Sequence, residues 1–340
     1  MIENHFIESD FTNKEILLSR RRFFRNSGTA FLATALLSSC NVIDDIFPKS
    51  GKAEDRDKTL AFFGDSLTIG AGGTAPYGNI VGAALDLRPV FSEGIVGQNA
   101  SRIAVRQGGV PLKLSVEGNK LNGIQPVKIT KLSNLFLSTP SNGDEYGRTG
   151  TVNGVRCTIR RKAVTGQDDV YTITPTTVSV IDVPADSEFL LEDAARLKTA
   201  TQILWYGRNN IGETDAEKEI LSALVSSIAY MTAPARYIIL GVLIAASENK
   251  GTENFNQTAA INAALAAKYG DLFVEMTPPT DAEMSAIGYT PTADDLVDLE
   301  KMNFPRGMRM DIINDDIHLN DKGYLIVANR VIDKLKALKY

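Results

Sequence analysis

The chain has few of the residues that build disulfide frameworks and metal clusters. Its 340 residues include only two cysteines, Cys40 and Cys157, and only two histidines, His5 and His318. Two cysteines are too few for a disulfide framework or a zinc-type ligand set. Any reaction that needs an imidazole therefore has only two positions in the chain that can supply one.

A long block of basic residues is also missing. The formal net charge is −5, so the composition gives no sign of a nucleic-acid partner. Hydrophobic residues make up 44% of the chain and charged residues 23%, which is ordinary for a globular protein. A chain of this length can bury a large core, in one domain or two.

The first forty residues have the order of an export signal. Residues 19–25 read Ser-Arg-Arg-Arg-Phe-Phe-Arg and resemble a twin-arginine signal. An apolar stretch follows at residues 28–39 and is too short to span a bilayer as a helix. It runs into Leu-Ser-Ser-Cys, ending at Cys40, which resembles a bacterial lipoprotein processing box. An uncleaved anchor, or a chance junction of basic and apolar residues, is the alternative.

This leader predicts a membrane-anchored protein. Residues 1–39 would be removed as a signal peptide, and Cys40 would become a lipidated N-terminus. The polar residues 40–58 would form a tether between the lipid anchor and the domain. The mature protein would face the periplasm, and Asn41 after the cysteine favours the outer membrane, by a rule that belongs to Gram-negative lipoproteins.

Apolar strands alternate with helices in two parts of the chain, residues 59–106 and 185–340. The alternation predicts an α/β domain with a mostly parallel, doubly wound sheet covered by helices on both faces. Residues 277–310 contain four prolines and are expected to be irregular. The expected strands are 59–63, 89–96, 201–206, 237–245 and 272–275, and the expected helices are 76–87, 214–231, 256–269 and 321–338.

Between these two parts, the apolar pattern changes to a period of two, which is typical of β-strands. Residues 151–156 read Thr-Val-Asn-Gly-Val-Arg, and an Asn-Gly pair favours the tight turn of a hairpin. Residues 170–173 and 178–181 are two further expected strands. We therefore predict an inserted β subdomain at residues 107–184.

Three polar segments each follow an expected strand: Gly64-Asp65-Ser66, Gly97, and Gly207-Arg208-Asn209. The carboxyl ends of parallel strands meet at one edge of a sheet, so these segments can converge there. Ser66 lies where the chain turns from strand toward helix, which leaves its hydroxyl exposed and its backbone N–H unbonded. It could supply both a nucleophile and an oxyanion donor. An N-capping serine is the alternative.

His318 has an acidic residue three positions before it, Asp315. This spacing lets a carboxylate and an imidazole pair within one turn, where the acid would fix the tautomer of the ring. If the leader is removed, His318 is the only histidine of the mature chain. The alternative is a solvated histidine on the surface.

Taken together, the blocks resemble the SGNH, or GDSL-type, serine hydrolase family. The resemblance covers residues 59–106 and 200–338 and implies a flavodoxin-like, three-layer α/β/α fold. It rests on four blocks in the family's order: Gly64-Asp65-Ser66, Gly97, Gly207-Arg208-Asn209-Asn210, and Asp315-Asp316-Ile317-His318.

The resemblance implies a role for each residue. Ser66 would be the nucleophile, His318 the base and Asp315 its partner. The N–H groups of Ser66 and Gly97 and the side-chain amide of Asn209 would form the oxyanion hole. No metal and no cofactor would be required.

The chain departs from the family's pattern at one position and offers two candidates at another. The family commonly has Asp where this chain has Asn210, although that position is neither an essential acid nor a donor in the family scheme. Gly94 is a rival for the role given to Gly97, but Gly97 is better placed after the expected strand.

The implied activity is ester hydrolysis through an acyl-enzyme, with O-acetyl esters on an envelope or extracellular polysaccharide as the expected substrate. A glycine-rich rim at residues 70–73 is expected to be flexible and to leave the site open. The insertion is expected to lean over the site and present Tyr171 to the glycan, or else to cap the fold or mediate self-association. The alternative functions are a polysaccharide O-acyltransferase, a lipase or lysophospholipase, and a glycan-binding protein on an inert scaffold. The oligomeric state stays open.

Overall fold

The computed structural model describes residues 57–140, 146–164, 166–310 and 315–340. The expected export segment and Cys40 lie outside these ranges, as does nearly all of the expected tether. Within the described ranges, no helix combines the length and the apolar character needed to cross a membrane.

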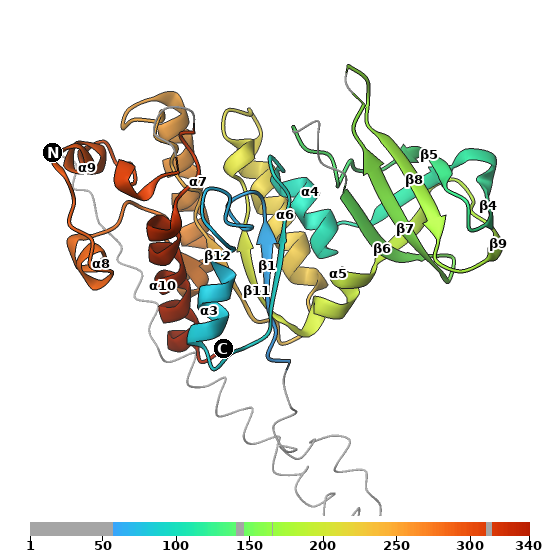
Figure 1. Cartoon of the computed structure of the whole chain (residues 1–340), viewed down its shortest axis with the longest axis horizontal. Helices are drawn as coiled ribbons and strands as arrows, with labels where there is room; N and C mark the ends of the chain where they lie inside the picture. Colours follow the sequence, from blue (N-terminus) through green and yellow to red (C-terminus); the bar gives the residue numbers. More distant parts are fainter. Residues whose placement is uncertain (1–56, 141–145, 165, 311–314) are drawn as a thin grey trace, which may run out of the picture. The chain divides into compact units, whose positions relative to one another are not determined.

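A parallel sheet of five strands forms the centre of the α/β part (Figure 1). The strand order is β13-β12-β11-β1-β2. β1 pairs with β11 on one side and with β2 on the other, and all these pairings are parallel. The predicted parallel sheet is therefore confirmed. The strands are β1 (Leu60–Gly64), β2 (Val90–Gly94), β11 (Thr201–Trp205), β12 (Tyr237–Leu240) and β13 (Phe273–Val274).

The sheet has a switch point between β1 and β11. The chain builds β1 and β2 outward on one side, then returns to lay β11, β12 and β13 outward on the other. In doubly wound sheets of this order, binding sites form beyond the carboxyl ends of the strands at the switch point. The turn after β1 and the turn after β11 therefore lie where a site is expected.

Helices cover both faces of this sheet. All five residues of β1 are buried, as a strand covered on both sides requires. Leu60 and Phe62 pack on one face with α3 (Gly78–Ala84) and α10 (Asp321–Leu338). Ala61 and Phe63 pack on the opposite face. The helices on that face are α4 (Ala100–Gln107), α6 (Ala216–Tyr230) and α7 (Glu253–Tyr269).

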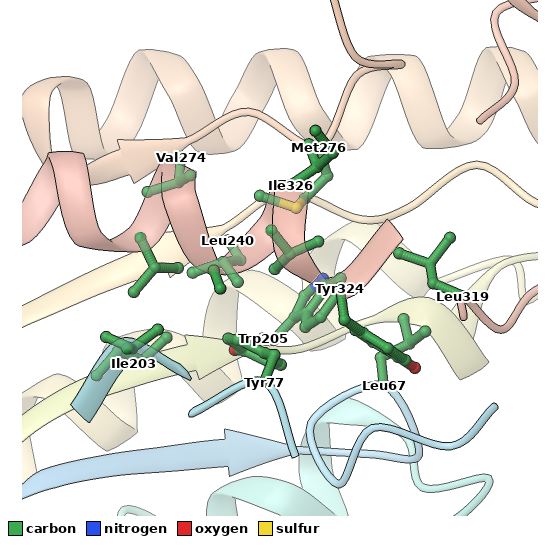
Figure 2. Close-up of a cluster of buried hydrophobic side chains, with 14 of the residues drawn as sticks. Leu67, Tyr77, Ile203, Trp205, Leu240, Val274, Met276, Leu319, Tyr324 and Ile326 are labelled. Carbon is green, nitrogen blue, oxygen red and sulfur yellow. The ribbon is translucent and has the colours of Figure 1, made fainter. Parts of the chain in front are cut away.

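The core on the α10 face reaches the end of the sheet where the turns lie. Figure 2 shows Tyr77, Trp205 and Tyr324 together in this cluster, with Leu67 and Leu319 at its edge. The Tyr77 ring is stacked on that of Tyr324, with 6.3 Å between the centroids and 6° between the planes. The buried indole N–H of Trp205 donates to Gly241 O over 2.9 Å, so this large side chain leaves no polar atom unpaired.

The expected β insertion is a closed barrel of six strands, in the order β10-β3-β5-β8-β7-β6. Asn153 and Gly154 have φ values of 46° and 80° in the turn between β6 and β7, so the predicted hairpin is confirmed. A separate ribbon pairs β4 with β9. The strands are β3 (Leu112–Val116), β4 (Lys120–Gly123), β5 (Val127–Leu132), β6 (Tyr146–Val152), β7 (Val155–Lys162), β8 (Val170–Pro175), β9 (Ser179–Asp182) and β10 (Ser187–Leu191).

The barrel extends beyond the predicted boundary at residue 184. Its closing strand is β10, which pairs with β3 and with β6. β10 runs without a turn into α5 (Glu192–Arg196), so no turn residues separate it in the sequence from the returning α/β domain. Tyr171 also differs from expectation, because its side chain is 4% exposed and packs in the barrel core. It does not face outward as a platform for a sugar.

The expected irregular segment contains two helices, so that prediction was wrong. α8 (Asp281–Ala286) and α9 (Ala293–Glu300) each begin with a capping box. In these boxes, a threonine and an acidic residue three positions later satisfy each other's backbone N–H groups. The threonines are Thr280 and Thr292, and a proline stands directly before each of them. Proline is compatible with a position just outside a helix N-terminus, so these prolines end loops and do not prevent the helices.

The closing role of β10 can be tested at Gly150 on β6. A Cβ at this position would lie 2.4 Å from Leu190 O and 2.4 Å from the Phe189 ring on β10. We expect Gly150→Ala to lower the free energy of unfolding by about 2–3 kcal/mol. Gly147→Ala on the same strand is the matched control, since its nearest neighbour would be 3.3 Å away, and it should cost less than about 1 kcal/mol. Urea denaturation measures both values, and equal losses would contradict this packing of β10.

Candidate active site

Ser66 lies in a tight turn directly after β1. A Cβ at Gly64 would come within 2.0 Å of Thr68 Oγ1 and 2.7 Å of Trp205 O, so glycine is required where the turn begins. Thr68 N donates to Asp65 O over 3.1 Å, and Ala71 N donates to Ser66 O over 3.0 Å. These bonds fix the backbone on both sides of the serine.

The structure brings His318 and Asp315 to this serine. His318 Nε2 lies 2.7 Å from Ser66 Oγ, and His318 Nδ1 lies 2.5 Å from Asp315 Oδ2. The other oxygen of Asp315 accepts the backbone N–H groups of Ile317, over 2.9 Å, and of His318, over 2.7 Å. The carboxylate is thus held from two sides and can orient the imidazole toward Ser66. Partial burial raises the pKa of Asp315, but the bonds from His318 and Ile317 outweigh it and lower the pKa below its usual value.

Asn209 joins the turns that follow β1 and β2. Its Nδ2 donates to Asp65 Oδ2 over 2.9 Å and to Gln98 O over 3.1 Å. These two acceptors account for both amide hydrogens, so donation to a substrate oxygen would replace one of these bonds. Gly97 precedes Gln98 in a turn with φ of +70°, and Gly207 precedes the Asn209 turn with φ of +106°. The three predicted segments therefore meet at one edge of the sheet.

Gly94 and Asn210 each have a structural role outside the proposed set of reacting groups and donors. Gly94 is the last residue of β2 and pairs with Gly64, and a Cβ there would lie 2.4 Å from Asp65 O. Asn210 is fully buried, and its Oδ1 accepts the N–H of Ala100 at the start of α4 over 2.9 Å. Its Nδ2 donates to Glu213 over 3.1 Å. Holding Ala100 needs only an acceptor oxygen, so asparagine at this position keeps the local structure intact.

The glycine-rich rim at residues 70–73, expected to be flexible, is tied to α10. Tyr324 donates its hydroxyl to Ala71 O over 2.7 Å, and Thr74 N donates to Asp321 Oδ1 over 2.7 Å. A Cβ at Gly72 would lie 2.5 Å from Leu319 O, so this rim approaches the residue after His318 closely. The rim thus helps to hold the histidine segment beside the serine turn.

Sequence reasoning missed a buried ion pair beside Asn209. Arg208 donates two hydrogen bonds to the carboxylate of Glu248, over 2.8 and 2.6 Å, and a third to Leu243 O over 2.6 Å. Glu248 also accepts the N–H of Ala245 over 2.9 Å. The next residue, Ala246, donates to the carbonyl of Asp316 over 2.7 Å. The pair therefore links the Asn209 turn to the segment that carries His318.

No spacing in the sequence identifies this partner, because Glu248 lies 40 positions beyond Arg208 in the chain. The only signal was the presence of Arg208 in the Gly-Arg-Asn-Asn block.

No protein-family model matches the chain, and no curated protein sequence is significantly similar to it. Solved structures resemble it distantly. One is a protein from Desulfitobacterium hafniense that is described as a lipolytic protein of the G-D-S-L family. It is 9% identical, with a TM-score of 0.41 over 82% of this chain and 99% of that one. LAE5, an α/β hydrolase enzyme from the metagenome of Lake Arreo, is 12% identical, with a TM-score of 0.40 over 83% of this chain and 97% of that one. At these scores the likeness assigns neither a family nor an activity.

The buried carboxyl of Asp65 gives a test of the site's electrostatics. Burial raises its pKa from 3.8 to about 6, although the hydrogen bond from Leu67 and the nearby arginines Arg208 and Arg106 oppose the rise. The folded state therefore holds this proton more tightly than the unfolded chain does. The stability that the protonated Asp65 carboxyl contributes is therefore complete below about pH 4 and is lost as the pH rises through 6.

Asp65→Asn imitates the protonated carboxyl at every pH. We expect the free energy of unfolding of the wild type, minus that of Asp65→Asn, to fall by about 2 kcal/mol between pH 4 and pH 7. Urea titrations at one-unit steps measure the difference, from which the other titrating groups cancel. A difference that stays constant over this range would show that ionised Asp65 is not penalised in the folded protein.

Proposed function

We propose that this protein is a serine esterase that hydrolyses carboxylic esters through an acyl-enzyme. The observation that carries the proposal is the chain of two short contacts, 2.7 Å from Ser66 Oγ to His318 Nε2 and 2.5 Å from His318 Nδ1 to Asp315 Oδ2. A serine within hydrogen-bond reach of an imidazole, itself oriented by a carboxylate, is the arrangement that activates a hydroxyl as a nucleophile.

In the proposed reaction, His318 Nε2 takes the proton of Ser66 as Oγ attacks the ester carbonyl. The alcohol leaves with that proton, and the acyl group stays on Ser66. Water then attacks the acyl-enzyme, His318 again takes the proton, and the carboxylic acid is released. Asp315 stays ionised and stabilises the imidazolium that forms in each step.

The proposed oxyanion donors are the N–H groups of Ser66 and Gly97 and the side-chain amide of Asn209. Two contacts support this set. Asn209 Nδ2 bonds to Asp65, which directly precedes Ser66, and to the carbonyl of Gln98, which directly follows Gly97. Removing one such donor typically raises the barrier by about 3 kcal/mol.

The proposal includes distant membership of the SGNH, or GDSL-type, hydrolase family. The support is the order of the four blocks in the sequence together with their convergence at the switch point of a parallel sheet. The barrel has no counterpart in the motifs that carry this resemblance.

Single substitutions in the three residues test the reaction. We expect Ser66→Ala and His318→Ala each to lower kcat for p-nitrophenyl acetate by roughly 10⁴-fold or more. Asp315→Asn should retain more activity than His318→Ala, because Asp315 orients the ring and transfers no proton. Thermal unfolding of each variant checks that the fold is kept. Unchanged turnover by folded Ser66→Ala would end the serine-esterase proposal.

The proposed substrate is an O-acetyl ester on an envelope or extracellular polysaccharide. Its support comes from the leader, which would place the enzyme where surface glycans are the abundant esters. The alternatives are a polysaccharide O-acyltransferase, in which a sugar hydroxyl replaces water, and a lipase.

Product analysis distinguishes the proposed acetyl esterase from the acyltransferase and the lipase. We expect acetate release from acetylated xylan, and faster hydrolysis of p-nitrophenyl acetate than of esters with acyl chains of eight carbons or more. Ser66→Ala is the control for acetate that is released without catalysis. A preference for the long chains, with no acetate released from any polysaccharide, would move the assignment to lipase. Transfer of acetyl to an added glycan in place of release would move it to acyltransferase.

The proposed location is the periplasmic face of a membrane, held by a lipid on Cys40. We expect Cys40→Ser to prevent labelling by a radioactive fatty acid, and replacement of both Arg20 and Arg21 by lysine to block export. Cys157, which is buried in the barrel, is the internal control, since it should carry no label in the wild type or in Cys40→Ser. Labelling experiments in which wild-type Cys40 stays unmodified would refute the anchor.

A further inference from the structure

The side chain of Gln98 connects the turn after β2 to the barrel. It is fully buried, and its Nε2 donates to the carbonyls of Phe136, over 2.7 Å, and Ser138, over 3.1 Å, in the segment between β5 and β6. Its Oε1 accepts Arg106 Nε over 2.7 Å. Every polar atom of this side chain thus has a partner, and two of the three bonds cross to the barrel.

Arg106 on α4 ties the same turn to the serine segment. Its guanidinium is nearly fully buried and donates to Gly64 O over 2.7 Å, two residues before Ser66. It also donates to the carbonyl of Glu93 over 2.9 Å and to the Glu93 carboxylate over 3.0 Å. One cation therefore contacts the ends of β1 and β2 and the side chain of Gln98.

Arg148 on β6 of the barrel completes this group. Its Nε and Nη2 both donate to Glu93 Oε1, over 2.8 and 2.6 Å. Glu93 is buried, with 6% of its surface exposed. One of its carboxylate oxygens accepts from both Arg106 of the α/β part and Arg148 of the barrel. We call Glu93, Gln98, Arg106 and Arg148 the junction cluster.

The barrel also touches the Gly97 turn directly. A Cβ at Gly97 would lie 2.3 Å from Pro140 Cδ, so the proline ring packs against this glycine. The segment before Pro140 is anchored inside the barrel, because Ser138 Oγ bonds to Asp169 and lies 2.9 Å from Tyr171 Oη. The barrel thus reaches the turn from two directions, through Pro140 and through Gln98.

We propose that the barrel clamps the Gly97 turn in its catalytic position, with Gln98 and Arg148 as positioning residues for the oxyanion donors. The inference rests on the proposed esterase function and deepens it. Gln98 lies beside Gly97 in the chain, so a shift of Gln98 moves the Gly97 donor directly. Its carbonyl also accepts a hydrogen bond from Asn209, so the same shift changes how that amide is held before substrate arrives. The barrel then contributes to the hydrolysis of every ester, including those that carry no sugar.

The test measures kcat and KM separately with p-nitrophenyl acetate, which is too small to need a glycan subsite. Gln98→Met keeps the length of the side chain and removes its three hydrogen bonds. Arg148→Gln removes both bonds to Glu93 at a position where 20% of the side chain is exposed, so it is the gentler change. We expect both variants to lower kcat at least about tenfold with KM within about twofold, since small misplacements of catalytic groups cost up to about a hundredfold.

Two further variants sharpen the result. Arg148→Lys keeps the charge but can offer Glu93 only one ammonium group in place of two N–H donors, so its kcat should fall between those of the wild type and Arg148→Gln. Arg156→Gln is the matched control, because Arg156 is an exposed barrel arginine paired with Glu192, away from the junction cluster. Its kcat should stay within about twofold of the wild type.

Titration with a fluorophosphonate counts the reactive Ser66 sites, so each kcat refers to folded enzyme only. If Gln98→Met and Arg148→Gln both keep kcat per labelled site within twofold of the wild type, the clamp proposal is wrong. If they raise KM and leave kcat unchanged, the barrel binds substrate and does not position the donors, which also overturns the proposal. Full activity of Ser66→Ala would instead refute the esterase function itself, so the two failures are distinguishable.

Discussion

The hydrogen bond between Ser66 and His318 joins residues 252 positions apart, and apolar packing holds them together. Leu67 follows Ser66 and Leu319 follows His318, and both leucines are buried in the cluster between the sheet and α10 (Figure 2). Full burial of a leucine side chain contributes about 1.5–3 kcal/mol, which exceeds the net contribution of about 1 kcal/mol that is typical of one hydrogen bond. Each polar side chain of the pair is therefore fixed by an apolar neighbour one residue along the chain.

The same edge of the sheet must also satisfy buried polar groups, and this shapes the proposed oxyanion hole. Asn209 donates to the carboxylate of Asp65 and to the neutral carbonyl of Gln98. A hydrogen bond to a carboxylate is roughly twice as strong as one to a neutral acceptor. When Asp65 is ionised, the longer bond to Gln98 is therefore the one that a substrate oxygen would replace. The bond to Asp65 would then keep the amide aimed at the site during the reaction.

Features that depend on residues close together in the sequence were predictable, and features that depend on contacts between distant residues were not. The turn at Gly64, the Asp315–His318 spacing and the Asn-Gly hairpin each involve neighbouring residues, and all three fold locally as expected. The Arg208–Glu248 pair and the junction cluster join segments with no shared period or spacing. Tyr171 was misjudged because period-two alternation gives two faces but does not say which one a closed barrel turns inward. The capping boxes of α8 and α9 are visible in the sequence, but the prediction gave more weight to the prolines beside them.

The place of the barrel in the chain explains why it can influence the site without contributing a reacting group. The chain enters the barrel from α4, whose first turn follows Gln98, and it returns through α5 into β11, which leads into the turn that carries Asn209. A domain held at both ends beside its docking surface loses less entropy on docking than a free one. Docking must still remove the charges of Glu93, Arg106 and Arg148 from water, which costs several kcal/mol per ion unless they pair closely. Glu93 and Arg106 already pair within the α/β part, but Arg148 reaches Glu93 only when barrel and sheet are together. The junction that seats the barrel is therefore part of the structure that holds the turn between Gly97 and Gln98.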